Sequence, residues 1–258
     1  MSTTIAAFRQ ISSNLPSTLD QVAKDPQVER ESEYYLANIS KIKSIDDFMG
    51  NDRIYRYVMK AYGLEEMTYA KAFIRRALTE GVDDSDSFAN RLADPRYKEL
   101  VADFNFERYG ETTTVFSRTQ QGTVDRYVRQ TLEVQAGDSN DGVRLALYFQ
   151  RKADTVTTPY ALLADKALLK VTQVMLGLPE ASGSLDIERQ ADLISKKLDI
   201  EDLKDPEKLD KMLTRFTALW DLDNAQPAPI LSLFDTASSG GGIATDLLSQ
   251  VQKTLRRG

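Results

Sequence analysis

Apolar residues recur along most of the chain three and four positions apart, the spacing that places them on one face of an α-helix. Ser44 and Asp47 have the spacing of a helix-capping box, and Gly63 stands where a left-handed C-cap would end the same helix. The apolar stripe between them consists of Phe48, Ile54, Tyr55, Val58, Met59 and Tyr62. A second stripe ends before Gly177 and consists of Leu162, Leu163, Leu168, Leu169, Val171 and Met175. This periodicity predicts an all-α protein, a bundle of helices.

Three Asp-Pro pairs mark further helix starts, namely Asp25-Pro26, Asp94-Pro95 and Asp205-Pro206. Aspartate accepts hydrogen bonds from the exposed N–H groups of a first turn, and proline lacks the N–H that would stay unpaired there. We also expect helices over 66–79, 123–134, 142–152 and 187–198, and short ones after Asp84 and Asp199. The string AGDSND predicts a turn, and the string ETTTVFSRTQQ predicts a loop or a short strand.

The chain also resembles itself. Residues 33–65 align without a gap on residues 147–179, at a constant offset of 114 residues. Residues 73–78 then resemble 193–198, and residues 92–104 resemble 203–216. The offset drifts, as it does when loops differ in length between two copies of one unit. We therefore predict two related helical units packed about a pseudo-twofold axis. Chance similarity between amphipathic helices is the alternative.

The repeat and the composition of the tail together divide the chain into six segments. These are an N-terminal helical segment (1–30), the first helical repeat (31–106), a connecting segment (107–144), the second helical repeat (145–222), a flexible linker (223–242) and a C-terminal amphipathic helix (243–258). Prolines, small polar residues and three consecutive glycines indicate the linker. The last helix has one apolar face, formed by Ile243, Leu247, Leu248, Val251 and Leu255. A helix this short is marginal alone, so it docks on its own domain, on another subunit or on a separate partner.

Composition excludes several classes of chemistry. Among the 258 residues there is no cysteine and no histidine, which removes thiol nucleophiles, disulfides, imidazole bases and the metal sites built from either side chain. The 33 Lys and Arg against 39 Asp and Glu give a net charge of −6. The chain therefore lacks overall the basic field on which binding to nucleic acid or anionic lipid depends.

The sequence predicts neither a cleaved secretory signal nor a membrane span. The N-terminus lacks the basic and apolar stretches of a cleaved secretory signal peptide. The most apolar window, YALLADKALLKVTQVMLGLP, carries Asp165, Lys166 and Lys170 and therefore indicates a core helix rather than a membrane span. We expect cytoplasmic synthesis, with export by a route that uses no cleaved signal left open.

No motif indicates a catalytic residue, a cofactor or a metal. The glycines at 240–242 lack the Gly-Lys-Ser and the preceding strand of a phosphate-binding loop. The acidic cluster at 83–90 lacks the central glycine and the closing glutamate of a calcium-binding loop. A solvated linker and a solvated helix start are the better interpretations of these two strings.

Two groups of side chains are candidate partner-binding surfaces. Arg53, Arg56 and Lys60 share one face of a helix and would suit an acidic partner, although a solvated face or pairing with acids of the same chain explains them as well. Tyr55 and Tyr62 belong to a cluster of six tyrosines between residues 34 and 69. Tyrosine is common in interface cores, and packing between neighbouring helices is the alternative.

Several strings together resemble a family of uncharacterised bacterial proteins known only as a domain of unknown function. They are SIDDFMGNDRIYRYVMKAYGLE, LADPRYKELVADFNF, VRLALYFQRKA, YALLADKALLKVTQVMLGLP and RFTALWD, within residues 20–222. Members of that family occur mainly in alphaproteobacteria and are often encoded among flagellar genes. The resemblance carries over no catalytic residue. It implies a structural or assembly role at the flagellum, with the protein in the cytoplasm or associated with the flagellum.

Three hypotheses about function follow. The first is a non-enzymatic protein-interaction or structural protein with a protein partner from the flagellum, or with itself through the C-terminal helix. The second is a helical protein that binds a small molecule, or hydrolyses one with carboxylates, in a groove between the repeats. The third is a regulator that acts on an acidic partner through Arg53, Arg56 and Lys60.

Overall fold

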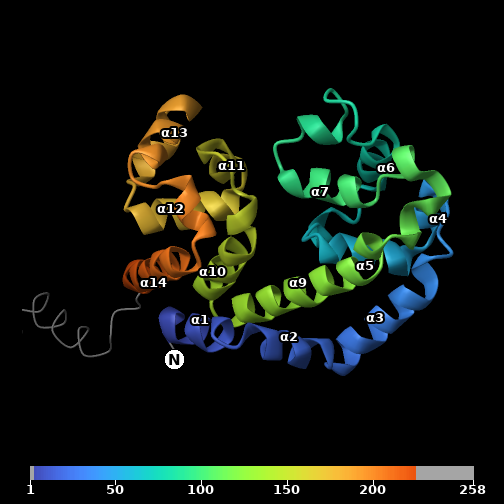
Figure 1. Ribbon diagram of the computed structural model, residues 1–258, viewed down its shortest axis with the longest axis horizontal. Helices are drawn as coiled ribbons and strands as arrows, with labels where there is room; N and C mark the ends of the chain where they lie inside the picture. Colours follow the sequence, from blue (N-terminus) through green and yellow to red (C-terminus); the bar gives the residue numbers. More distant parts are fainter. Residues whose placement is uncertain (1–2, 225–258) are drawn as a thin grey trace, which may run out of the picture. The chain divides into compact units, whose positions relative to one another are not determined.

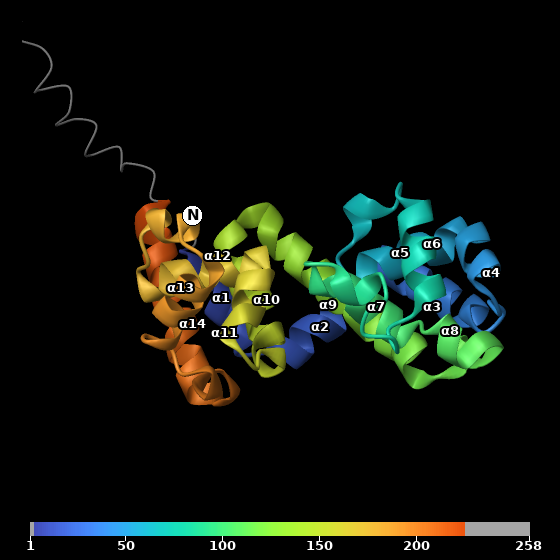
Figure 2. The same cartoon turned by 90° about the horizontal axis from the view of Figure 1, so that it is seen from above.

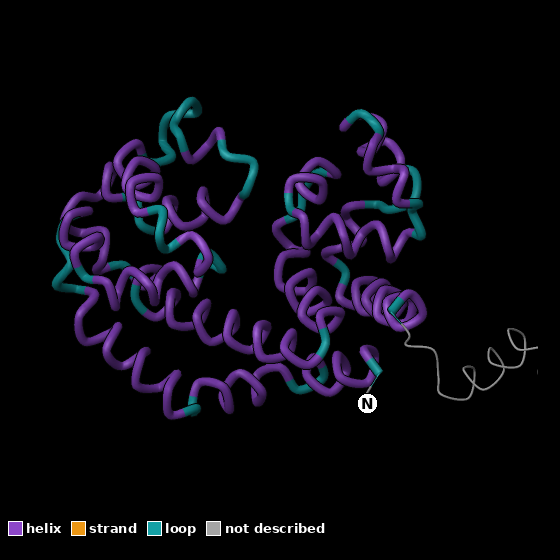
Figure 3. Tube along the Cα trace, turned by 180° about the vertical axis from the view of Figure 1, so that it is seen from behind, coloured by secondary structure: helices purple, strands orange, loops and turns teal. Residues whose placement is uncertain are grey.

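The computed structural model describes residues 3–224, which form α-helices and short 3-10 helices and include no strand (Figure 3). The all-α prediction is confirmed for this part of the chain. None of the helices within it has the length and apolar content needed to cross a membrane. The chain divides into two units, Met1–Trp220 and Asp221–Gly258, and the packing described below lies within the first. Most of the predicted linker and all of the predicted C-terminal helix lie outside the described residues.

The first unit contains two hydrophobic cores, each surrounded by its own group of helices (Figures 1 and 2). The first lobe consists of α2 (Leu15–Ala23), α3 (Pro26–Ile39), α4 (Ile45–Gly50), α5 (Asp52–Ala61), α6 (Lys71–Glu80), α7 (Pro95–Asp103), α8 (Phe106–Tyr109) and the first part of α9 (Gln121–Ser139). Its largest fully buried side chains include Tyr35, Phe48, Tyr55 and Phe104. Aromatic rings thus fill much of the first core.

The second lobe has a smaller and mainly aliphatic core. It consists of α1 (Thr4–Ser12), α10 (Asp141–Lys152), α11 (Pro159–Ala164), α12 (Lys166–Leu176), α13 (Ile187–Ser195) and α14 (Pro206–Asp223). Phe8 of α1 is fully buried in this core, whereas Val22 of the following helix α2 is buried in the first. The chain therefore crosses from one lobe to the other twice, between α1 and α2 and again along α9.

Local capping signals are confirmed at the helix starts. Asp25, Asp94 and Asp205 each accept backbone N–H hydrogen bonds two residues ahead, and proline follows each of them. Ser44 and Asp47 form a reciprocal capping box at the start of α4. These aspartates act as structural caps, as the sequence predicts.

The two long apolar stripes prove to be interrupted. The first is divided between α4 and α5 because the side chain of Asn51 caps a new helix by accepting from the N–H of Ile54 at 3.1 Å. The second is divided between α11 and α12, where Asp165 accepts from the N–H groups of Ala167 and Leu168. Both faces remain apolar across the break, which is why periodicity alone does not reveal it.

The break expected at AGDSND is shorter than predicted, since α9 continues to Ser139 and only Asn140 separates it from α10. Asn140 caps α10 and also donates to Thr4 of α1 at 2.8 Å. The Thr-rich string is also not a strand. It forms 3-10 helices at Gly110–Val115 and Ser117–Thr119, whose buried hydroxyls bond nearby carbonyl groups. The helix expected from residue 66 begins at Lys71, after a 3-10 turn at Glu65–Met67.

The order of elements is the same in both predicted repeats. Ser44 and Thr158 precede α4 and α11, and the helix pairs α5/α12, α6/α13 and α7/α14 follow in order. Gly63 and Gly177 end α5 and α12 with positive φ angles of 68° and 59°, a backbone conformation that favours glycine. This correspondence supports the duplication, which stays a prediction.

Candidate functional site

Two of the cations predicted to face a partner are engaged within the chain. Arg53 donates to both carboxylate oxygens of Glu31, at 2.8 and 3.0 Å, and its guanidinium carbon lies 3.7 Å from the ring centre of Tyr34. Arg56 donates to Asp52 at 2.6 Å. Both cations are partly or largely exposed, so an acidic partner would have to compete with these contacts.

The other predicted partner-binding residues lie in different surroundings. The ammonium group of Lys60 lies 4.9 Å from the ring centre of Tyr127. Tyr55 and Tyr62 are buried in the first core and pack on other aromatic rings, so helix packing explains them. The remaining four, Leu247, Leu248, Val251 and Leu255, lie outside the described residues.

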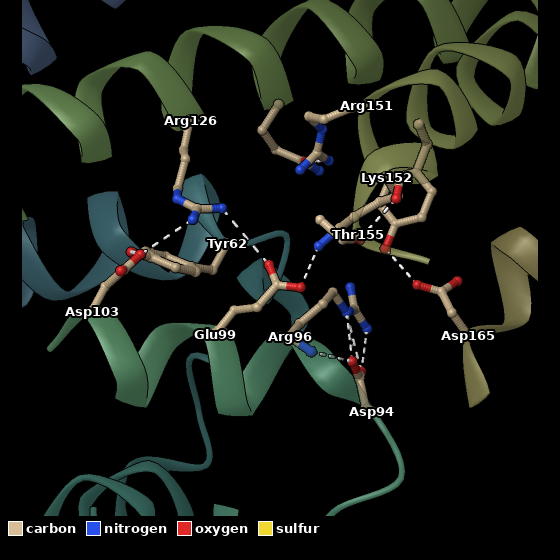
Figure 4. A network of polar contacts seen from close by, with 12 residues as sticks. Tyr62, Asp94, Arg96, Glu99, Asp103, Arg126, Arg151, Lys152, Thr155 and Asp165 are labelled. Carbon is tan, nitrogen blue, oxygen red and sulfur yellow. Dashed lines mark hydrogen bonds and ion pairs between the residues drawn. The ribbon is translucent and has the colours of Figure 1, made fainter. Parts of the chain in front are cut away.

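A cluster of charged side chains lies where the two lobes meet (Figure 4). The first lobe contributes residues of α7 and Arg126 of α9, and the second lobe contributes Arg151 and Lys152 at the end of α10. Glu99 of α7 accepts a hydrogen bond from the ammonium group of Lys152, whose side chain is 8% exposed. The same carboxylate lies 3.7 Å from Arg126. Glu99 therefore joins a cation of each lobe.

Asp103 is the second carboxylate of α7 at this junction. It lies 3.2 Å from the guanidinium group of Arg126 and accepts a hydrogen bond of 2.6 Å from the hydroxyl of Tyr62. Burial, reinforced by the negative charge of Asp103, raises the pKa of Tyr62 well above its ordinary value. Tyr62 is therefore a fixed hydrogen-bond donor near neutral pH rather than a proton carrier.

A buried ion triad lies behind this cluster and holds α9 against α10. Glu133 is 1% exposed and accepts from Arg129 at 3.0 Å and from Arg151 at 2.7 and 2.8 Å. Arg129 also donates to the carbonyl of Leu147 at 2.8 Å. Burial lowers the pKa of Arg129, whereas Glu133 outweighs burial at Arg151 and raises its pKa. Each of the three buried side chains therefore has a partner of opposite charge.

Two further pairs complete the junction. Arg96 bonds both carboxylate oxygens of Asp94 and the carbonyl of Gly63. The hydroxyl of Tyr148 donates to Asp165 at 2.5 Å, and burial followed by the charge of Asp165 raises the pKa of Tyr148. These contacts fix side chains of α7, α10 and the α11–α12 break.

The junction encloses a small polar cavity of about 30 Å³. Four cations line it, Arg96, Arg126, Arg151 and Lys152, together with Glu99 and neutral polar side chains. A water molecule needs about 10–15 Å³ measured in this way, so the cavity has room for roughly two. Each of the four cations has a carboxylate partner, which leaves none dedicated to a ligand. Within residues 3–224, no group of three or more acidic side chains is arranged to hold a metal ion.

A wider cleft of about 350 Å³ opens beside this cavity, between α7 and the α11–α12 pair. Its walls present matching helical stripes, which are Pro95, Lys98, Glu99 and Ala102 on one side and Ala161, Ala164, Asp165 and Leu168 on the other. Lys152 belongs to both the cleft and the cavity. The cleft is therefore mainly apolar, with the Glu99–Lys152 ion pair among its lining.

No local signal in the sequence marks this junction. Lys152 and Glu99 are 53 residues apart in the sequence. Arg126 and Asp103 belong to two different helices, α9 and α7, and no shared sequence motif connects them. The charged residues of the α9–α10 hairpin look like the polar face of an amphipathic helix. Only the packing of α10 against α9 turns Glu133 and Arg151 toward each other.

Comparison with known proteins identifies relatives but no activity. A family model described as "Protein of unknown function (DUF1217)" matches residues 61–209. The chain is also similar to a protein of Agrobacterium tumefaciens with an X-ray crystal structure. The two chains are 48% identical and superpose with a TM-score of 0.81, over 86% of this chain and 94% of the other. No curated protein matches the sequence.

Proposed function

Because the chain belongs to the family described as proteins of unknown function (DUF1217), we propose its function from its own geometry and sequence. The protein is a non-enzymatic interaction protein that serves the structure or assembly of the bacterial flagellum. Its work is to bind another protein, and the two lobes give it a fixed surface for doing so.

The pairing of the charged groups at the lobe junction with one another is the observation that supports this proposal most. Glu99, Asp103 and Glu133 each lie beside an arginine or lysine, around a cavity of about 30 Å³. The Glu99–Lys152 and Glu133–Arg151 pairs join α7 and α9 to α10 of the second lobe, which supports a structural use of the charges.

The flagellar part of the proposal rests on the family resemblance of the sequence and on the gene neighbourhood of that family. The absence of cysteine agrees with a protein that works in more than one redox compartment. The described residues form packed helices rather than a long coiled coil, which favours an accessory or assembly role over a place in the flagellar axis.

Affinity isolation of the full-length chain tests this proposal. A tagged protein expressed at its natural level in a motile strain is expected to co-purify with a flagellar component. The same isolation from a strain that assembles no flagella is the control for unrelated binding. Recovery of the same partners from both strains, none of them flagellar, would remove the flagellar role.

Binding of a small molecule in the α7/α11–α12 cleft is a second candidate function. The observation that favours it is the cleft volume of about 350 Å³, which falls within the roughly 300–1,000 Å³ of most small-molecule sites. A ligand there is expected to raise the melting temperature of the wild-type protein. The variant Ala164→Leu, which adds bulk to a residue that lines the cleft, is expected to lose that rise. An equal rise in both proteins would place the ligand elsewhere.

A further inference from the structure

A groove of about 520 Å³ lies between the helices α1 and α2 on one side and α9 on the other. α2 runs beside α9, and α1 packs against α10 at the end of that helix (Figure 1). α2 lines the groove with Thr18, Gln21 and Val22, and Asp25 follows at the N-cap of α3. α9 lines it with Leu132, Gln135, Ala136 and Ser139. Within each wall these positions are three and four residues apart, so the lining residues of each helix lie on one face, and that face borders the groove.

The lining of this groove contains little charge. Its floor is apolar and includes Ile11, Val22 and Leu132. Of all the lining residues only Asp25 is charged, in a chain with 28% charged residues. The carboxylate of Asp25 already caps α3 by accepting from two backbone N–H groups. Depletion of charge around an apolar centre is typical of the core of a protein–protein interface.

Uncharged amide groups stand along the rim. The side chains of Gln10, Gln21 and Gln135 are exposed, and none of them makes a hydrogen bond within residues 3–224. Each amide offers two donors and one acceptor. An occupant with an apolar strip bordered by amide or hydroxyl side chains would pack its strip on the apolar floor and form hydrogen bonds with the amide groups of the rim. A charged side chain on the occupant would lose its hydration here and find no partner of opposite charge except the capping carboxylate.

We propose that this groove docks an amphipathic helix of another protein, whose contacting face carries aliphatic side chains flanked by uncharged polar ones. Two helical walls that present parallel stripes are the arrangement that receives a helix in a groove. The inference rests on the proposed interaction function and adds the surface and the chemistry of the partner segment.

Site-specific photo-crosslinking in living cells tests the groove directly. A photoreactive amino acid replaces Gln135 in the full-length chain, expressed in a bacterium that encodes the protein. Asp138, which is exposed on the same helix and does not line the groove, carries the same group in the control. A product specific to position 135 is expected, and the peptide attached to it is expected to have a helical apolar strip flanked by uncharged residues.

A charge placed in the groove tests the predicted chemistry. Gln21→Lys puts an ammonium group on the rim, whereas Ser17→Lys puts the same group on an exposed position of α2 outside the lining. The one carboxylate in the lining, Asp25, is already used to cap α3. Since an ammonium group that loses its hydration without a free partner is strongly unfavourable, the yield of the position-135 product should fall about tenfold or more in Gln21→Lys. It should stay unchanged in Ser17→Lys, and both variants should keep the wild-type melting temperature.

Several outcomes would overturn the inference. One is a cross-linked product from position 135 that is no stronger than the product from position 138. Another is attachment of position 135 to a second copy of this chain, to lipid or to a charged segment. The last is a cross-linking yield that Gln21→Lys leaves unchanged. A specific product with a non-flagellar helix would keep the inference and remove the flagellar part of the proposed function. A motility defect without any groove-specific product would keep the flagellar part of the proposed function and remove the inference about the groove.

Discussion

Asp94 connects helix capping to the charged junction of the two lobes. Its carboxylate accepts from the N–H of Arg96 at 3.0 Å and from the guanidinium group of the same residue at 2.7 Å. Burial opposes ionisation of this carboxyl group, but the bonds from Arg96 outweigh it and hold the pKa of Asp94 below its ordinary value. One residue therefore starts α7 and orients a cation that lines the polar cavity.

The variant Asp94→Asn separates these two contributions, because asparagine caps a helix about as well as aspartate but carries no charge. A lowered pKa stabilises the folded state fully above the ordinary value of about 3.9, and this stabilisation is lost as pH falls through the folded value. Near neutral pH the variant should be less stable by about 1 kcal/mol or less. The difference should shrink toward zero in urea titrations at acidic pH, and a difference that is constant with pH would contradict the assignment.

Gly142 is a residue whose importance comes from packing alone. It lies in the first turn of α10, where a Cβ atom would lie 2.6 Å from the Nε1 atom of Trp220 and 2.8 Å from its Cγ atom. Gly142→Ala should therefore destabilise the protein by about 1–3 kcal/mol, the usual effect of overpacking. Gly50→Ala is the matched control, since no atom lies within 4 Å of its added Cβ. Urea unfolding followed by circular dichroism measures both, and equal stabilities would show that Trp220 is free to move aside.

Among the helices, the starts marked by local caps could be predicted from the sequence, whereas the breaks within the two apolar stripes could not. Caps such as Asp205 depend on contacts within a few residues, which a sequence displays directly. Where α9 continues through Gly137, beyond its predicted end, the side chain of Arg144 in α10 packs against that glycine. The break at Asn51 depends on a single side-chain bond within a continuous apolar face. Tertiary contacts decide such positions, and local propensity does not.

The α9–α10 hairpin depends on the buried triad around Glu133. Glu133→Gln removes the charge that Arg129 and Arg151 share and leaves two buried cations without a full partner. Breaking such a buried pair costs about 3–5 kcal/mol. Asp20→Asn breaks the exposed pair with Lys24, which has the same i,i+4 spacing as Arg129 and Glu133. It should lower the stability far less, because solvent screens an exposed pair. Thermal unfolding of both variants is the measurement, and similar losses would show that the triad is solvated.

For the whole molecule, the division into two helical groups follows the repeat boundaries read from the sequence only in part. The N-terminal segment is shared, since Phe8 belongs to the second core and Val22 to the first. Such long-range placement has no local signature, because an apolar stripe does not identify which helix will cover it. For the same reason the sequence indicated Arg53 as a partner-binding residue, although Glu31, 22 residues earlier, binds it in the folded chain.

The cleft beside α7 and the groove beside α9 differ in the charge of their linings, so contacts made in them should differ in their dependence on salt. The cleft beside α7 contains the Glu99–Lys152 ion pair, whereas the groove beside α9 has one charged residue that is already used as a cap. Contacts at the α9 groove should therefore depend little on ionic strength, because exposed ion pairs are the contacts that salt weakens. Cross-linking yields from position 135 at low and high salt measure this, and a steep decline with salt would contradict it.

The proposed function is to serve the flagellum by binding a protein partner. The most direct measurement is the swimming speed and filament number of a clean deletion strain, compared with the same strain carrying the wild-type gene in trans. The proposal predicts impaired swimming or fewer filaments in the deletion strain, restored by the wild-type gene. Normal swimming and normal filaments in the deletion strain would contradict it.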